Sequence, residues 1–204
     1  MALDTMLTFC RGALTNHDRE DDHPMGVTSV VAYLDGKELA HSERQLGTTV
    51  SEFDAELAAL ESGALLAQSL LVSRPHSRIT LLCPNPSAIS AILNVGPHPG
   101  QRFSLSFKLT TDNLLSHRRD VQVAVAWAPQ ARTLVGFARA KHLSDTIAAR
   151  PLPPNHHEPH SISFQRSRRS RRGACDGKIA TAGRSPMSLC RNHQTESSPQ
   201  LFRV

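Results

Sequence analysis

The dipeptide Asp35-Gly36, which directly follows a run rich in β-branched residues, constrains the fold of this chain more than any other local feature. Val27 to Leu34 precedes it and reads as a buried strand. An Asp-Gly pair accommodates the positive φ angles that a two-residue hairpin turn requires. Lys37 to Leu46 is then the returning strand, so the sequence predicts an antiparallel hairpin.

The other expected elements surround this hairpin. Met6 to Cys10 is predicted as a first strand, and the polar, acidic segment from Ala13 to Gly26 as a loop. After the hairpin we expect a helix from Ser51 to Ser73, a strand from Ile79 to Cys83, helices over Ser87 to Asn94 and Phe103 to Leu115, a strand over Val121 to Trp127 and a helix over Phe137 to Ala149. This order predicts an α/β fold, a mixed sheet with helices on its faces.

Three local roles follow from residue type and spacing. Ser51 is expected to cap the long helix, with Asp54 fitting the capping-box spacing less well than Glu would. Asn85 is expected to cap the short helix that follows Pro84. Trp127 is expected in the core.

Charge divides the chain near residue 150. Residues 1–150 carry 14 Lys and Arg against 15 Asp and Glu, whereas residues 151–204 carry 9 against 3. The tail is rich in Pro, Ser, Arg and His and poor in apolar residues, which predicts disorder because little surface can be buried. The sequence therefore predicts one domain over residues 1–150 and a disordered basic tail over residues 151–204.

A dense basic run in the tail is the candidate nucleic-acid-binding segment. Its arginines are Arg166, Arg168, Arg169, Arg171 and Arg172. Such a run binds RNA or DNA phosphates without sequence preference, or serves as a nuclear-import signal. Two plainer interpretations stay open: a solvated tail, or non-coding sequence translated from an erroneous gene model.

No targeting or membrane segment is evident. The N-terminus lacks a basic stretch followed by a long apolar one, so we expect an intracellular protein that is not secreted, in the nucleus or the cytoplasm. The most apolar stretch, Leu57 to Val72, is too short and too polar to span a bilayer. Cys10 and Cys83 lie in apolar runs, where buried free thiols are the ordinary expectation.

Three motifs, taken with the hairpin and the order of elements, point to a family. They are Ala55-Glu56-Leu57 in the long helix, the strand–helix junction from Leu82 to Ile89, and Trp127-x-Pro129. Over roughly residues 5–150 the chain resembles a ribonuclease H domain, and is most similar to the divergent domains of fungal retrotransposon polyproteins and of genes derived from them. The resemblance implies an RNase H-like mixed five-stranded sheet flanked by helices.

The resemblance also implies where a catalytic site would lie. In that family four carboxylates hold two Mg²⁺ ions, which activate the attacking water and stabilise the leaving oxygen of the RNA strand in RNA–DNA hybrids. Glu56 matches the helix glutamate, but Arg11, Pro84 and Lys141 stand at the three aspartate positions. The family histidine after Trp-x-Pro-Gly is also absent, since Gln130 and Ala131 occupy that turn.

One carboxylate beside two cations should repel Mg²⁺, so we expect no bound metal or other cofactor. Asp145, one turn beyond Lys141, is a poor substitute because it would move the ligand oxygen by about 5–6 Å along the helix. Glu56 also has a structural interpretation, since an acidic residue near a helix N-terminus is favoured by the helix dipole. Without its partners, that role takes precedence.

The sequence therefore favours a catalytically degenerate, retroelement-derived RNase H-like domain with at most residual nucleic-acid or protein binding. The first alternative is an active Mg²⁺-dependent endonuclease that cleaves the RNA of RNA–DNA hybrids, with Glu56 in its family role and unusual ligands for the rest. The second alternative is a non-functional pseudogene product.

Overall fold

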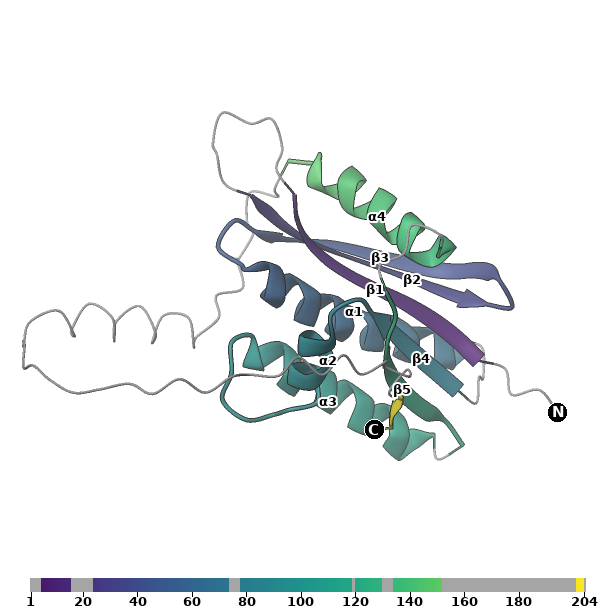
Figure 1. The fold of residues 1–204 in the computed structure, drawn as a ribbon. Coiled ribbons are helices and arrows are strands. Elements are labelled where there is room, and N and C mark those ends of the chain that lie inside the picture. Colours follow the sequence, from purple (N-terminus) through teal and green to yellow (C-terminus); the bar gives the residue numbers. More distant parts are fainter. Residues whose placement is uncertain are drawn as a thin grey trace, which may run out of the picture.

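A mixed sheet lies between two layers of helices in the computed structural model, which describes residues 5–15, 24–73, 78–118, 120–129, 134–151 and 201–203 (Figure 1). The strands are β1 (Thr5–Thr15), β2 (Met25–Leu34), β3 (Lys37–Gly47), β4 (Arg78–Cys83), β5 (Gln122–Trp127) and β6 (Leu201–Arg203). They are ordered β3-β2-β1-β4-β5-β6 across the sheet. β1, β4 and β5 run parallel, and the remaining neighbours pair antiparallel.

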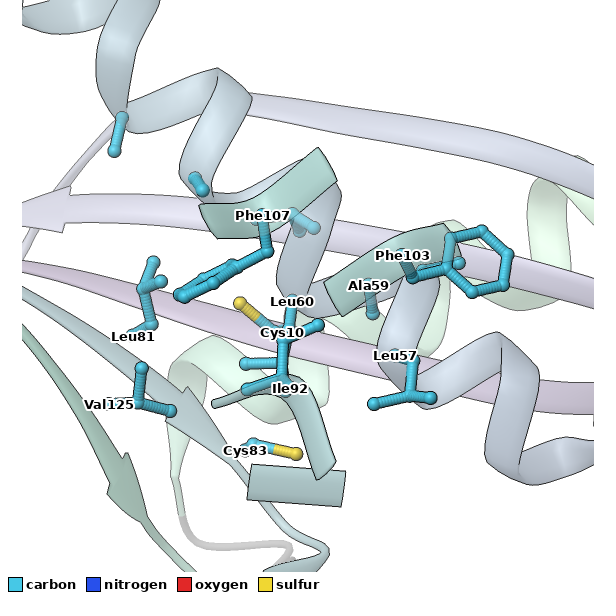
Figure 2. Close-up of a cluster of buried hydrophobic side chains, with 14 of the residues drawn as sticks. Cys10, Leu57, Ala59, Leu60, Leu81, Cys83, Ile92, Phe103, Phe107 and Val125 are labelled. Atoms are coloured by element: carbon cyan, nitrogen blue, oxygen red, sulfur yellow. The ribbon is translucent and has the colours of Figure 1, made fainter. Parts of the chain in front are cut away.

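Helices cover both faces of the sheet. They are α1 (Glu52–Ser73), α2 (Pro86–Ile92), α3 (Gln101–His117) and α4 (Val135–Ala148). α1, α2 and α3 lie on one face and α4 on the other (Figure 1). The main core lies under α1 to α3, where Phe103 and Phe107 of α3 meet Leu57 and Leu60 of α1 above Cys10 of β1 (Figure 2). The predicted α/β fold with helices on both faces is confirmed.

The predicted hairpin is also confirmed. Asp35 and Gly36 have φ angles of 49° and 75°, the positive values that a two-residue turn of this kind requires. β2 is buried along most of its length, because α1 packs on one of its faces and α4 on the other. This double burial explains why β2 reads as a continuous apolar run and not as an alternating one.

The start of α1 is better capped than its sequence suggests. The Ser51 backbone N–H and hydroxyl donate to Asp54 Oδ2, at 3.2 and 2.8 Å, and the Asp54 N–H donates to Ser51 Oγ at 3.1 Å. These reciprocal bonds form a capping box with aspartate in the place of the usual glutamate. The expected capping role of Ser51 is confirmed, and the box fixes the first turn of the helix that carries Glu56.

Buried polar contacts fix α4 against the sheet. Ser29 Oγ of β2 donates to the Ala140 carbonyl at 2.7 Å and lies 2.7 Å from Ser144 Oγ. Gln45 Nε2 of β3 donates to the Ile147 and Arg150 carbonyls, at 2.8 and 2.7 Å. The Gln45 contacts satisfy carbonyl groups at the helix end that have no partner within the helix. These bonds hold α4 against β2 and β3 from Ala140 to the end of the helix.

Two predicted boundaries are wrong. β1 continues to Thr15 and β2 begins at Met25, so Thr15 pairs with Met25 inside the segment expected to be a loop. The extra residues of β1 and β2 are held by backbone hydrogen bonds to each other, which the sequence of side chains does not predict. Residues 16–23, in the middle of that segment, lie outside the described residues.

Near the end of the predicted tail, Leu201–Arg203 pairs with β5 as β6, drawn in yellow beside it (Figure 1). β5 is the edge of the expected five-stranded sheet and offers unpaired N–H and C=O groups to any extended segment. Residues 152–200 of the predicted disordered tail lie outside the described residues. In the described part of the chain, no helix is both long enough and apolar enough to cross a membrane.

Candidate functional site

The positions singled out by the family resemblance lie on four elements: Arg11 in β1, Glu56 in α1, Pro84 directly after β4, and Lys141 in α4. Phe9 of β1 pairs with Leu82 of β4 in parallel register, so Arg11 lies level with Pro84, two residues further along each chain. The first strand was predicted to end at Cys10, but β1 continues to Thr15, so Arg11 lies inside the strand. Arg11 is consequently held within the strand by its pairing with Ser29 of β2.

Gly12 brings α1 into direct contact with β1 beside Arg11. A Cβ atom at Gly12 would lie 2.1 Å from the Ala55 carbonyl carbon and 2.2 Å from the Glu56 nitrogen. Only a residue without a side chain permits this approach. The Glu56 backbone is therefore placed against the strand that carries Arg11.

Asn85 holds the Glu56 carboxylate. Its Nδ2 donates a short hydrogen bond to Glu56 Oε2, while its Oδ1 accepts bonds from the backbone N–H groups of Ser87 at 2.9 Å and Ala88 at 3.3 Å. The predicted N-cap role of Asn85 is confirmed. Its contact with Glu56 was missed, because an N-cap signal gives no information about which distant side chain the amide will meet.

Pro84 and Trp127 form the side of the site next to β5. Trp127 Nε1 donates to the Pro84 carbonyl oxygen at 3.0 Å, which links the ends of β4 and β5. The expectation that Trp127 lies in the core is wrong, since it is 37% exposed. An indole that must satisfy its N–H at a strand end commonly keeps one edge in solvent.

Arg11 is the cation of the site. Its side chain is half-buried, and burial lowers its pKa, while the charges of Asp145, Glu52 and Glu56 oppose that effect. The Arg11 Nε atom is buried and makes no hydrogen bond to the described residues. The guanidinium therefore interacts with the three carboxylates mainly through space.

Lys141 and Asp145 pair with each other on the surface of α4. Lys141 Nζ donates to Asp145 Oδ2 at 2.6 Å, and the two side chains are 60% and 54% exposed. Asp145 is thus engaged by Lys141 at the surface of α4, which argues further against its use as a replacement metal ligand. The arginines at 166, 168, 169, 171 and 172, and the turn at Gln130 and Ala131, lie outside the described residues.

Glu56 itself is buried, with 8% of its surface exposed. Burial raises the pKa of Glu56 most strongly, and the nearby Glu52 charge raises it further. The hydrogen bond from Asn85 and the Arg11 charge act in the opposite direction without cancelling the rise. The folded domain therefore disfavours the ionised form of Glu56 relative to the protonated form.

The residues around Glu56 do not fit a pair of Mg²⁺ ions. Mg²⁺ requires several hard oxygen ligands in nearly octahedral geometry. Here one carboxylate is joined by an amide N–H and a guanidinium, which present donors and positive charge in the place of oxygens. Among the residues that the structure describes, no group of three or more His, Cys, Asp or Glu side chains could hold a metal ion.

Glu56→Gln is expected to stabilise the domain near pH 7 by about 0.5–1 kcal/mol, within the range of single stabilising substitutions. Because the folded-state pKa of Glu56 is raised, its contribution to stability is full below the unfolded-state pKa and is lost as the pH rises through the folded-state pKa. The gain on substitution should therefore shrink toward about pH 4. Urea unfolding at both pH values measures it, with Glu61→Gln as the control, because Glu61 lies in the same helix and pairs with Arg44. An equal loss of stability at both pH values would contradict this account.

Comparison with known proteins identifies the fold. No protein-family model matches the chain, and no curated protein matches it in sequence. Among solved structures, the N-terminal RNase H domain of Rv2228c from Mycobacterium tuberculosis, studied as a maltose-binding-protein fusion, matches with a TM-score of 0.51 and 14% identity. That match covers 70% of this chain and 97% of the other.

Two further structures agree. LC11-RNase H1 in complex with an RNA/DNA hybrid matches with a TM-score of 0.51 and 11% identity, over 71% of this chain and 99% of that one. The protease–reverse transcriptase of prototype foamy virus matches with a TM-score of 0.51 and 14% identity, over 72% of this chain and 21% of the viral one. The described part of this chain therefore has an RNase H-like fold.

Proposed function

We propose that this chain is a catalytically degenerate RNase H-like domain, derived from a retroelement, that retains at most nucleic-acid or protein binding. The observation that supports this proposal is the engagement of the Glu56 carboxylate by the Asn85 amide beside the Arg11 guanidinium. In this proposal Glu56 is the one family carboxylate left, and Arg11, Pro84 and Lys141 occupy the degenerate positions.

Electrostatics make two-metal chemistry unfavourable at this site. At a separation of roughly 5 Å and an effective dielectric constant of about 20, a guanidinium and a divalent cation repel each other by about 6–7 kcal/mol before screening by salt. One carboxylate, already bonded to Asn85, supplies neither the negative charge nor the number of oxygen ligands that two divalent cations beside a guanidinium require. The site is better suited to remaining without a metal than to assembling two.

The proposed nucleic-acid affinity belongs to the basic run from Arg166 to Arg172. The body of the chain is nearly neutral, whereas the excess of positive charge falls after residue 150. LC11-RNase H1 was solved with an RNA/DNA hybrid, so a hybrid is a suitable probe. Replacing all five arginines of the run by serine should abolish salt-sensitive hybrid binding and leaves Leu201–Arg203 available to pair with β5.

We also propose a domain over residues 1–150, with an intracellular location. Cys10 and Cys83 are both free and buried, as is common in a reducing compartment. Burial raises the pKa of each thiol, that of Cys83 to about 12. Both cysteines therefore behave as small apolar core residues, with no sign of reactive thiolate character.

A cleavage assay tests the loss of activity. An RNA–DNA hybrid is incubated with the full chain in Mg²⁺ or Mn²⁺, beside Glu56→Gln and the matched control Glu61→Gln, a residue of the same helix that pairs with Arg44 at 3.0 Å. The three proteins should give the same background cleavage. Cleavage by the wild type and Glu61→Gln that is lost in Glu56→Gln would establish the alternative, an active Mg²⁺-dependent endonuclease.

The same samples address the pseudogene alternative. A folded chain whose binding of the hybrid disappears when the five arginines are replaced retains a function in its tail. A folded chain with neither cleavage nor salt-sensitive binding supports a non-functional product or a domain that binds only protein.

A further inference from the structure

We infer that the Arg11 guanidinium replaces the divalent cations of an RNase H site as the positive charge that balances Glu52, Glu56 and Asp145. This inference rests on the proposed degeneracy and adds a specific role for one residue. It implies a domain whose folding is independent of Mg²⁺, with the required charge attached covalently to β1.

The backbone places Arg11 between the two helix layers. Phe9 packs against Phe137 of α4, and side chains two residues apart in a strand face the same side, so Arg11 also points toward α4. Its strand partner Ser29 is bonded to Ala140 and lies against Ser144 of the same helix. Asp145 follows directly after Ser144 in α4.

On the other side of the strand, the next residue brings the acidic helix within reach. Gly12 touches the backbone of Ala55 and Glu56, so the start of α1 crosses β1 beside Arg11. Glu52 lies one turn before Glu56 in α1. Arg11 starts from a strand that lies between α4 and α1, so its long side chain interacts electrostatically with carboxylates of both helices: Asp145 of α4, and Glu52 and Glu56 of α1.

The charged groups around Arg11 explain why a cation is needed at this place in the fold. The charged groups are Glu52 and Glu56 from α1, Arg11 from β1, and Lys141 and Asp145 from α4; Asn85 contributes a neutral amide. The Lys141 ammonium is already bonded to Asp145 at the surface. Removing Arg11 would leave buried Glu56 facing Glu52 with only an amide as partner, which is the situation that a divalent cation relieves in an RNase H site.

The inference predicts that loss of Arg11 makes the domain sensitive to metal. Thermal unfolding is measured for the wild type, Arg11→Met and Arg11→Asp in EDTA and in about 10 mM Mn²⁺ or Mg²⁺ at matched ionic strength. The wild-type Tm should be the same in both conditions. Both variants should melt lower in EDTA and regain about 2–4 °C with Mn²⁺, and Arg11→Asp should regain more because it adds a carboxylate ligand.

Arg139→Met is the matched control. Arg139 is an α4 arginine close in sequence to Lys141, but it pairs with Glu38 of β3 at 3.1 Å. Its substitution should lower the Tm without any response to metal. If Arg11→Asp fails to fold, Arg11→Met and Arg11→Gln carry the same comparison, since neither adds a negative charge.

Two results would overturn the inference: a wild-type Tm that rises with Mn²⁺ as much as that of the variants, or Arg11 variants that respond to metal no more than Arg139→Met. The second result would leave the proposed degeneracy intact, because it concerns only which group balances the charge. Glu56-dependent hybrid cleavage by the wild type would instead remove the proposed function. The two failures are therefore distinguishable.

Discussion

Gly12→Ala is expected to lower the free energy of unfolding by at least about 3 kcal/mol, the upper part of the range for overpacked cores. The new Cβ would lie 2.1, 2.2 and 2.3 Å from backbone atoms of Ala55 and Glu56 in α1. Carbon atoms in ordinary contact are about 3.5–4.0 Å apart. Backbone in the middle of a capped helix cannot rotate away as a side chain can, so α1 would have to lift off β1.

Urea unfolding followed by far-UV circular dichroism measures this loss. Gly36→Ala is the control, because Gly36 has a positive φ of 75° and open space where its Cβ would stand, so its substitution adds backbone strain without overpacking. That substitution should cost only about 1–2 kcal/mol of backbone strain. Equal losses for the two variants would show that α1 is not seated on Gly12, and the placement of Glu56 beside Arg11 would then need another cause.

Phe9→Ala is expected to lower the free energy of unfolding by about 3–5 kcal/mol. The Phe9 ring meets Tyr33 and Phe137 edge to face, with centroid separations of 5.7 and 5.2 Å. Gly136 packs so tightly on the same ring that a Cβ there would lie 2.2 Å from Phe9 Cδ2. The first turn of α4 thus packs directly on the Phe9 ring, and removal of the ring leaves a cavity under that helix.

Hydrogen exchange locates the damage in this variant. Amides of α4 should exchange faster in Phe9→Ala, while those of α1 keep most of their protection because α1 packs on the opposite face of the sheet. Leu7→Ala, at a partly exposed position on the same face of β1, should cost less than about 1 kcal/mol. Unchanged exchange in α4 would mean that Ser29 and Gln45 hold this helix without help from Phe9.

Much of the fold could be predicted because its determinants are local. The turn at Asp35 and Gly36 depends on backbone angles that few residue pairs adopt, and apolar residues at helical spacing or in short runs mark the helices and several strands. The extension of β1 to Thr15 and the pairing of Leu201–Arg203 with β5 could not be predicted in this way. Both depend on backbone partners that are distant in sequence and leave no mark on side-chain periodicity.

The sequence singled out the residues of the candidate site but did not predict their contacts. Family spacing pointed to Glu56, Arg11, Pro84 and Lys141, and the register of β1 with β4 sets Arg11 level with Pro84. The bond from Asn85 to Glu56 and the pairing of Lys141 with Asp145 depend on where side chains end after the helices have packed. Sequence spacing fixes where a Cα lies far better than which neighbour its side chain selects.

Asn85 both caps α2 and donates to Glu56, and these two contacts limit which residues the position can accept. An aspartate at this position would still accept the bonds that begin α2, but it would exchange an attractive contact with Glu56 for repulsion between two carboxylates. Replacing Asn85 by an acidic residue is therefore expected to destabilise the domain unless a further cation is introduced at the same time. A lineage that had acquired this asparagine would be held there by its own folding stability, with no need for selection on any present activity.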